Sequence, residues 1–175
     1  MAAVLFQQRT EQLEAWLADR RARGEDIRDE VWEGVYVVMA PAPRFAHARL
    51  AAQLHSLLNG AAERAGLVAG DVANIGTSDD YRIPDYVIVD AATAASDAAW
   101  LPTALVVGEI RSPGEAFEEK LPFYWARGVL EALLLDPETR TFRWLGRGPD
   151  GWTELRRSGV LDLDVAAVSS AIRWP

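Results

Sequence analysis

The stretch "TALVVGEIR" at residues 103–111 is the strongest constraint on the fold of this chain. Its apolar residues run without the polar alternation of a half-exposed strand, so the pattern predicts a strand buried on both faces. Such a strand lies within a sheet that other elements cover on either side. We therefore expect an α/β (mixed α+β) chain with a mixed β-sheet flanked by helices.

Periodicity and turn residues predict the other elements. Segments with apolar residues at helical spacing are predicted helices, and they lie at residues 7–23, 45–66 and 112–128. Segments rich in β-branched and aromatic residues are predicted strands, and they lie at residues 29–40, 67–76, 81–90, 129–146 and 151–157, with the turn "DPET" dividing 129–146 into two strands. Residues 91–102 read as a loop with a short helix, and residues 161–172 as a terminal strand or short helix.

Three local features refine this prediction. Residues 29–40 are predicted to form a strand, or a hairpin that turns at Gly34. "TSDD" at residues 77–80 is a predicted turn between the strands on either side of it. Pro122 must interrupt or restart the helix that begins after Ser112, because proline costs about 3 kcal/mol in a helix interior. The result is one predicted domain, residues 1–175, with a core at about 29–145, an N-terminal helical extension at 1–24, and extra C-terminal strands.

Composition limits the compartment and the partners. The chain has no cysteine and no apolar run long enough for a membrane helix, so we expect a cytoplasmic protein without membrane contact. Its net charge of −8 argues against a protein that coats nucleic acid through basic side chains. A nucleic-acid enzyme stays possible, because a carboxylate-rich site carries its positive charge as bound metal. Seven tryptophans are enough both for the core and for a homodimer interface.

Two acidic residues mark the ends of apolar strands. Asp85 stands at the head of "DYVIVD" and Glu109 at the tail of "LVVGE". Because side chains alternate along a strand, Asp85 shares a face with Val87 and Val89, and Glu109 shares one with Val107. If the strands are neighbours, the two carboxylates converge at one end of the sheet. Paired hard oxygen ligands there suit Mg²⁺ or Mn²⁺.

These residues resemble a nuclease pattern. "PD" at 84–85 followed by "EIR" at 109–111 is similar to the PD-(D/E)xK motif, with arginine in place of the lysine. A longer set of strings, in order between residues 29 and 143, resembles the Uma2 family of restriction-endonuclease-like proteins. The strings are "DEVWEGVYVVMAP", "PRFAHARLAAQL", "RIPDYVIVD", "VVGEIRSP", "KLPFYWARGV" and "LLLDPETRT".

The resemblance implies a restriction-endonuclease-like fold and a divalent-metal site. On this reading Asp85 and Glu109 bind Mg²⁺ or Mn²⁺, and Ile110 contributes its backbone carbonyl. Lys120, the single lysine among 18 basic residues, matches a catalytic lysine moved to the following helix, with Arg111 as the competing cation. Glu30 matches the N-terminal catalytic acid of the family, with Glu33 as the competing choice.

Further matches lie around this set. His47 matches a histidine at the start of the first core helix, and Tyr124 matches a tyrosine one turn after the lysine. With Arg111, these two are candidates for supporting the metal ligands or contacting phosphate. Four of these residues also have a purely structural interpretation. Lys120 and Glu30 are then solvated side chains, Glu109 is an ion-pair partner of Arg111, and Tyr124 belongs to the hydrophobic core.

The resemblance thus implies a metal-dependent endonuclease that hydrolyses DNA, of restriction or mobile-element type. The alternative is a nuclease-fold module that has lost its chemistry and acts as a binding or interaction protein. Nothing in the chain reads bases, so RNA stays open as a substrate, and so does sequence specificity.

Overall fold

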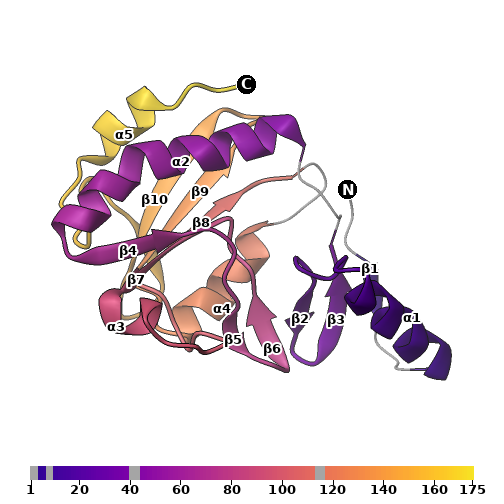
Figure 1. Ribbon diagram of the computed structural model, residues 1–175. Helices are drawn as coiled ribbons and strands as arrows, with labels where there is room; N and C mark the ends of the chain where they lie inside the picture. The colour runs from indigo at the N-terminus through magenta and orange to yellow at the C-terminus, as the bar shows by residue number, and fades with distance from the viewer. Residues whose placement is uncertain (1–3, 7–9, 40–43, 113–116) are drawn as a thin grey trace.

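The computed structural model describes residues 4–6, 10–39, 44–112 and 117–175. Its strands form two sheets, and its helices pack around them (Figure 1). The helices are α1 (Glu11–Ala22), α2 (Phe45–Arg64), α3 (Ala91–Ala94), the 3₁₀ turn η1 (Phe117–Lys120), α4 (Leu121–Ala126) and α5 (Val165–Ala171). The strands are β1 (Val4–Phe6), β2 (Glu30–Trp32), β3 (Val35–Val38), β4 (Leu67–Gly70), β5 (Ile75–Thr77), β6 (Asp80–Arg82), β7 (Tyr86–Asp90), β8 (Val106–Ile110), β9 (Glu131–Asp136), β10 (Thr141–Arg147) and β11 (Trp152–Glu154).

The larger sheet has six strands in the order β11-β10-β9-β8-β7-β4. It is mixed, because β8 and β9 run parallel while the other pairs are antiparallel. Helix α2 lies along one face of this sheet with α5 beside it, and η1 and α4 pack on the opposite face (Figure 1). Every residue of β8 is buried, as its unbroken apolar run predicts.

Leucines at helical spacing attach α2 to the larger sheet. Leu50, Leu54 and Leu58 are fully buried against the face that carries Tyr86 and Ile88. The other face carries Val87, Val89 and Val107, which pack against Phe117, Phe123 and Tyr124 of η1 and α4. Fully burying one such aliphatic side chain stabilises the fold by about 1.5–3 kcal/mol, so both helix layers are firmly held.

The smaller sheet has five antiparallel strands in the order β1-β3-β2-β6-β5, and α1 packs against it through Leu13 and Leu17. A buried ion pair reinforces this contact: Arg20 on α1 donates to Asp29 at 2.9 Å. Asp29 also accepts from the Tyr36 hydroxyl at 3.1 Å. The network fixes the start of β2, where Glu30 begins the strand.

The mixed α+β fold class is confirmed, and the structure adds a division that the sequence pattern did not reveal. The segment "YRIPDYVIVD" is not one strand: β6 ends at Arg82 and β7 begins at Tyr86, in different sheets. Pro84 lies in the break, where it has no N–H to offer a ladder. The predicted strand 67–76 divides in the same way into β4 and β5.

Most other predicted elements are found. Gly34 turns the β2–β3 hairpin with a φ of 81°, and the helix restarts as α4 with Pro122 in its first turn. The predicted start of that helix lies partly in residues 113–116, outside the described residues. At the N-terminus α1 begins later than predicted, after the capping hydroxyl of Thr10, and β1 precedes it. The terminal segment is a helix, α5. In the described residues, no helix is both long and apolar enough to span a membrane.

Candidate active site

Strands β7 and β8 are neighbours, as the expected convergence of the two acids requires. They pair antiparallel with Tyr86 opposite Gly108, and the N–H of Asp85 donates to the Gly108 carbonyl at 2.9 Å. Continuing this register puts Asp85 opposite Glu109, with both side chains on the face covered by α4. The backbone N–H of Ile110 donates to Asp85 Oδ2 at 2.9 Å. Asp85, Glu109 and Ile110 therefore gather at one end of the central strand pair.

Glu109 is a buried acid held by two donors. Its Oε1 accepts from the Tyr124 hydroxyl, and its Oε2 accepts from Lys120 Nζ at 3.2 Å. Burial is the main reason why the pKa of Glu109 rises to about 8, and the charges of Asp85 and Glu30 raise it further. Lys120 and the Tyr124 hydroxyl oppose that rise. Burial thus favours the protonated form of Glu109 in the metal-free protein.

Lys120 connects the two sheets. Its side chain is 3 % exposed, and Nζ donates to Glu30 Oε1 at 2.9 Å as well as to Glu109. The interpretation of Lys120 as a solvated helix residue is therefore wrong. It is the final residue of η1 and the N-cap residue of α4, which begins at Leu121.

Glu30 is buried and fixed by its own strand and the adjoining segment. Its Oε1 accepts from the N–H of Ile83 at 2.8 Å, and its Oε2 accepts from Trp32 Nε1 at 2.6 Å. Glu33, the competing acid, lies exposed in the β2–β3 turn with a φ of 49°. Of the two glutamates, the structure therefore brings Glu30 to Lys120 and leaves Glu33 at the turn.

Two side chains, Arg28 and His47, approach Oδ1 of Asp85. Arg28 Nη1 donates to Oδ1 at 3.1 Å. His47 Nε2, from the first turn of α2, lies 2.9 Å from the same oxygen but off the direction of a hydrogen bond. Burial opposes ionisation of Asp85, but His47, Lys120 and the Ile110 N–H outweigh it and hold the pKa of Asp85 below its ordinary value.

Arg111 points elsewhere. Its Nη1 donates to Asp136 at the end of β9, at 2.7 Å, so the expected pairing with Glu109 is not made. Lys120 occupies the position beside Glu109 instead. Of the two cations considered for the catalytic role, only Lys120 contacts Glu30 and Glu109 in the described part of the chain.

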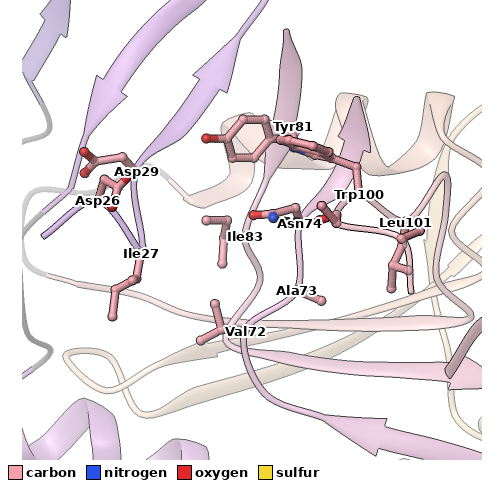
Figure 2. A pocket seen from close by; sticks show the side chains of 12 residues that line it. Asp26, Ile27, Asp29, Val72, Ala73, Asn74, Tyr81, Ile83, Trp100 and Leu101 are labelled. Carbon is pink, nitrogen blue, oxygen red and sulfur yellow. Dashed lines mark hydrogen bonds between the residues drawn. The ribbon is translucent and has the colours of Figure 1, made fainter. Parts of the chain in front are cut away.

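A pocket of about 550 Å³ adjoins this cluster. Figure 2 shows Asp26 and Ile27 on one side, Trp100 and Leu101 across from them, and Ile83 and Asn74 between. Ile83, which lines the pocket, also donates its N–H to Glu30, so the pocket lies next to this buried acid. No sequence pattern indicated this pocket, because its walls come from four separate segments.

The comparisons with known proteins decide the family. A family model described as "Putative restriction endonuclease" matches residues 10–173. The chain belongs to the Uma2 family. The structure is also similar to the crystal structure of a "putative nuclease belonging to DUF820" from Anabaena variabilis, with a TM-score of 0.67 and 15% sequence identity. That match covers 81% of this chain and 89% of the other, and at such identity it shows the fold alone. No curated protein matches the chain.

The donors of this Uma2 chain fit a divalent cation. Asp85, Glu109 and the Ile110 carbonyl offer the oxygen ligands that Mg²⁺ and Mn²⁺ prefer. Burial, the main cause of the raised pKa of Glu109, makes its charged form costly, and a bound cation would offset that cost. Among the described residues, no three His, Cys, Asp or Glu side chains are grouped as metal ligands.

Arg28 was not predicted as a site residue, although it contacts Asp85, which lies 57 positions later in the sequence. No motif marks it, and its position depends on how the segment before β2 crosses to β7. Proximity to Glu30 in the sequence was the one available signal.

Proposed function

We propose that this Uma2 chain is a divalent-metal-dependent endonuclease that hydrolyses DNA phosphodiester bonds, of restriction or mobile-element type. The observation that carries the proposal is the ion-pair cluster in which Lys120 contacts both Glu30 and Glu109 beside Asp85. A buried lysine among three acids is costly for stability unless its charge is used or compensated. Membership of a family described as restriction endonucleases supports the same activity.

Asp85, Glu109 and the Ile110 carbonyl would hold Mg²⁺ or Mn²⁺. When bound, such a cation lowers the pKa of water and polarises a phosphoryl oxygen. The Ile110 N–H orients Asp85 by its bond to Oδ2, and the Tyr124 hydroxyl orients Glu109 by its bond to Oε1. Both carboxylates are therefore fixed before substrate arrives, which lowers the reorganisation needed on binding.

Lys120 is the proposed catalytic cation. Hydrolysis joins a water oxygen to phosphorus and breaks the bond from phosphorus to one ester oxygen, so negative charge develops on the phosphoryl group. A compact ammonium beside the carboxylates stabilises that charge. Glu30 positions Lys120 through the 2.9 Å contact, while Trp32 and Ile83 hold Glu30.

Several finer features belong to the same proposal. DNA is the proposed substrate, with RNA as the alternative. A homodimer and a cytoplasmic location complete the proposal, on the grounds of the small size of the chain and its lack of cysteine. The proposed domain includes residues 1–175.

A cleavage assay tests the proposal. Supercoiled, linear and single-stranded DNA, and a matched RNA, are incubated with the protein in Mg²⁺, Mn²⁺ or EDTA. We expect cleavage of DNA that requires the divalent ion and is lost in Asp85→Asn. Asp150→Asn makes the same chemical change at an exposed position in the turn after β10, and it should cleave like the wild type.

Two results would contradict the proposal. Equal cleavage by wild type and Asp85→Asn would mean that the activity arises elsewhere. No cleavage of any substrate in any ion would favour the alternative of a nuclease-fold module that binds partners without chemistry.

A further inference from the structure

We propose that Arg28 neutralises Asp85 in the metal-free protein and moves to the DNA phosphate when a divalent cation binds Asp85. Arg28 is thus both a substitute for the cation and a phosphate-binding residue. The proposal rests on the proposed function, because it assigns a role within the same site.

The contact that Arg28 makes is single and replaceable. Its guanidinium donates one hydrogen bond, from Nη1 to Asp85 Oδ1 at 3.1 Å, and Asp85 is its one partner among the described residues. The side chain of Arg28 is 30% exposed, whereas that of Asp85 is 9% exposed. Arg20 offers a contrast, because it is 8% exposed and bonds both Asp29 and the Glu25 carbonyl. Arg28 can leave its partner at much lower cost than Arg20 can.

Arg28 contacts Oδ1, the oxygen of Asp85 that has no backbone N–H donor in the described residues. Asp85 Oδ2 is already satisfied by the Ile110 N–H, and His47 approaches Oδ1 without hydrogen-bond geometry. A divalent cation on Oδ1 would repel Arg28, because a guanidinium cannot lose its charge at accessible pH. Its other N–H groups form a planar fork that matches a phosphate in bidentate fashion.

The position of Arg28 suits a substrate contact. The residues on either side of it, Ile27 and Asp29, line the pocket, and Figure 2 shows them on the same side of it as Asp26. Arg28 is therefore close in sequence to the pocket wall, while its guanidinium reaches Asp85.

The competing explanation is that Arg28 only orients Asp85. The two explanations predict opposite effects on metal affinity. An orienting residue improves binding of the cation, so its loss weakens binding. A residue that competes for Oδ1 weakens binding of the cation, so its loss strengthens it.

Calorimetric titration with Mn²⁺ alone separates these cases, using Arg28→Ala, Arg28→Gln and Arg28→Lys. We expect Arg28→Ala and Arg28→Gln to bind Mn²⁺ about tenfold more tightly than the wild type, a difference of about 1.4 kcal/mol. Arg28→Lys keeps the charge and should bind Mn²⁺ like the wild type. Arg143→Ala, which removes an exposed ion pair with Glu154, is the control and should leave affinity unchanged.

The second measurement is binding to a DNA duplex in Ca²⁺, which takes the same oxygen ligands, followed by fluorescence anisotropy over a salt series. Loss of one phosphate contact lowers the slope of log K against log salt by about 0.9. We expect that decrease in Arg28→Ala and Arg28→Gln, together with weaker DNA binding, and no change in Arg143→Ala.

Weaker Mn²⁺ binding in Arg28→Ala and Arg28→Gln would overturn the proposal and leave Arg28 as an orienting residue. An unchanged salt slope would overturn the phosphate contact. If the wild type binds no Mn²⁺, the proposed function fails and this inference fails with it. If the wild type binds Mn²⁺ and the Arg28 variants bind it more weakly, only this inference fails.

Discussion

Lys120 and Glu30 form a buried ion pair at 2.9 Å, with side chains 3% and 1% exposed. The pair joins η1 to β2, two elements that are 90 residues apart in the sequence. It therefore connects the two sheets at the point where the candidate catalytic residues meet. The stability of the chain and the geometry of the site depend on the same contact.

Replacement of Lys120 by methionine should destabilise the fold. Glu30 and Glu109 would lose their shared cation, and breaking a buried pair costs about 3–5 kcal/mol. Urea denaturation at pH 7 measures the free energy of unfolding. Glu119→Ala changes the preceding, exposed residue and should stay within about 0.5 kcal/mol of wild type. Equal stability of Lys120→Met and wild type would show that the pair contributes nothing.

Arg111 should be dispensable for cleavage, whereas Lys120 should not. Arg111 is occupied by Asp136 at 2.7 Å, and Lys120 contacts Glu109. We expect Arg111→Ala to keep kcat within about threefold, and Lys120→Ala to lower kcat by roughly 10²–10³, the effect of losing one charge-stabilising donor. A larger loss in Arg111→Ala than in Lys120→Ala would reverse the assignment of the catalytic cation.

The Tyr124 hydroxyl should lower the pKa of Glu109. In Tyr124→Phe that hydrogen bond is lost, so the pKa of Glu109 should rise above its value of about 8 in the metal-free protein. Carbon-13 NMR of the glutamate carboxyls in EDTA follows the titration. Tyr86→Phe removes a hydroxyl that bonds Asn59 and should leave the pKa of Glu109 unmoved. Equal pKa values in all three proteins would contradict the contact.

The metal-free protein should lose stability as the pH rises toward 8. The pKa of Glu109 is raised in the folded state, from 4.5 to about 8, so folding favours its protonated form. Its contribution to stability is complete below pH 4.5 and is lost as the pH rises through about 8. The lowered pKa of Asp85 acts in a separate, more acidic window, where stability falls as the pH drops below 3.8.

Thermal unfolding in EDTA between pH 5 and pH 9 measures this effect. Glu109→Gln removes the titrating group and should flatten the profile between about pH 5 and pH 8. A wild-type profile as flat as that of Glu109→Gln would show that the pKa of Glu109 is not raised.

Local sequence patterns predicted much of the fold and the composition of the candidate site. The unbroken apolar run of β8 required burial on both faces, and its ending at Glu109 pointed to an acid at the sheet end. The spacing of leucines in α2 gave both the helix and its buried face. These are local properties of period and burial, so the sequence alone is sufficient for them.

Long-range packing accounts for what could not be predicted. Pro84 did not indicate that β6 and β7 would enter different sheets. Proline is found both at breaks between strands and on edge strands, so its presence does not distinguish the two cases. The choice between Glu30 and Glu33 depended on where the β2–β3 turn falls. Arg28 reaches Asp85 only through the path of the segment before β2, and the pocket depends on the same path.

Calorimetric titration of wild type and Asp85→Asn with Mn²⁺ tests the central claim most directly, because it measures capture of the cation without any assumption about substrate. We expect the wild type to bind with micromolar to millimolar affinity and the variant to show no binding. Equal Mn²⁺ binding by the two proteins, or none by the wild type, would contradict a metal site built on Asp85 and Glu109.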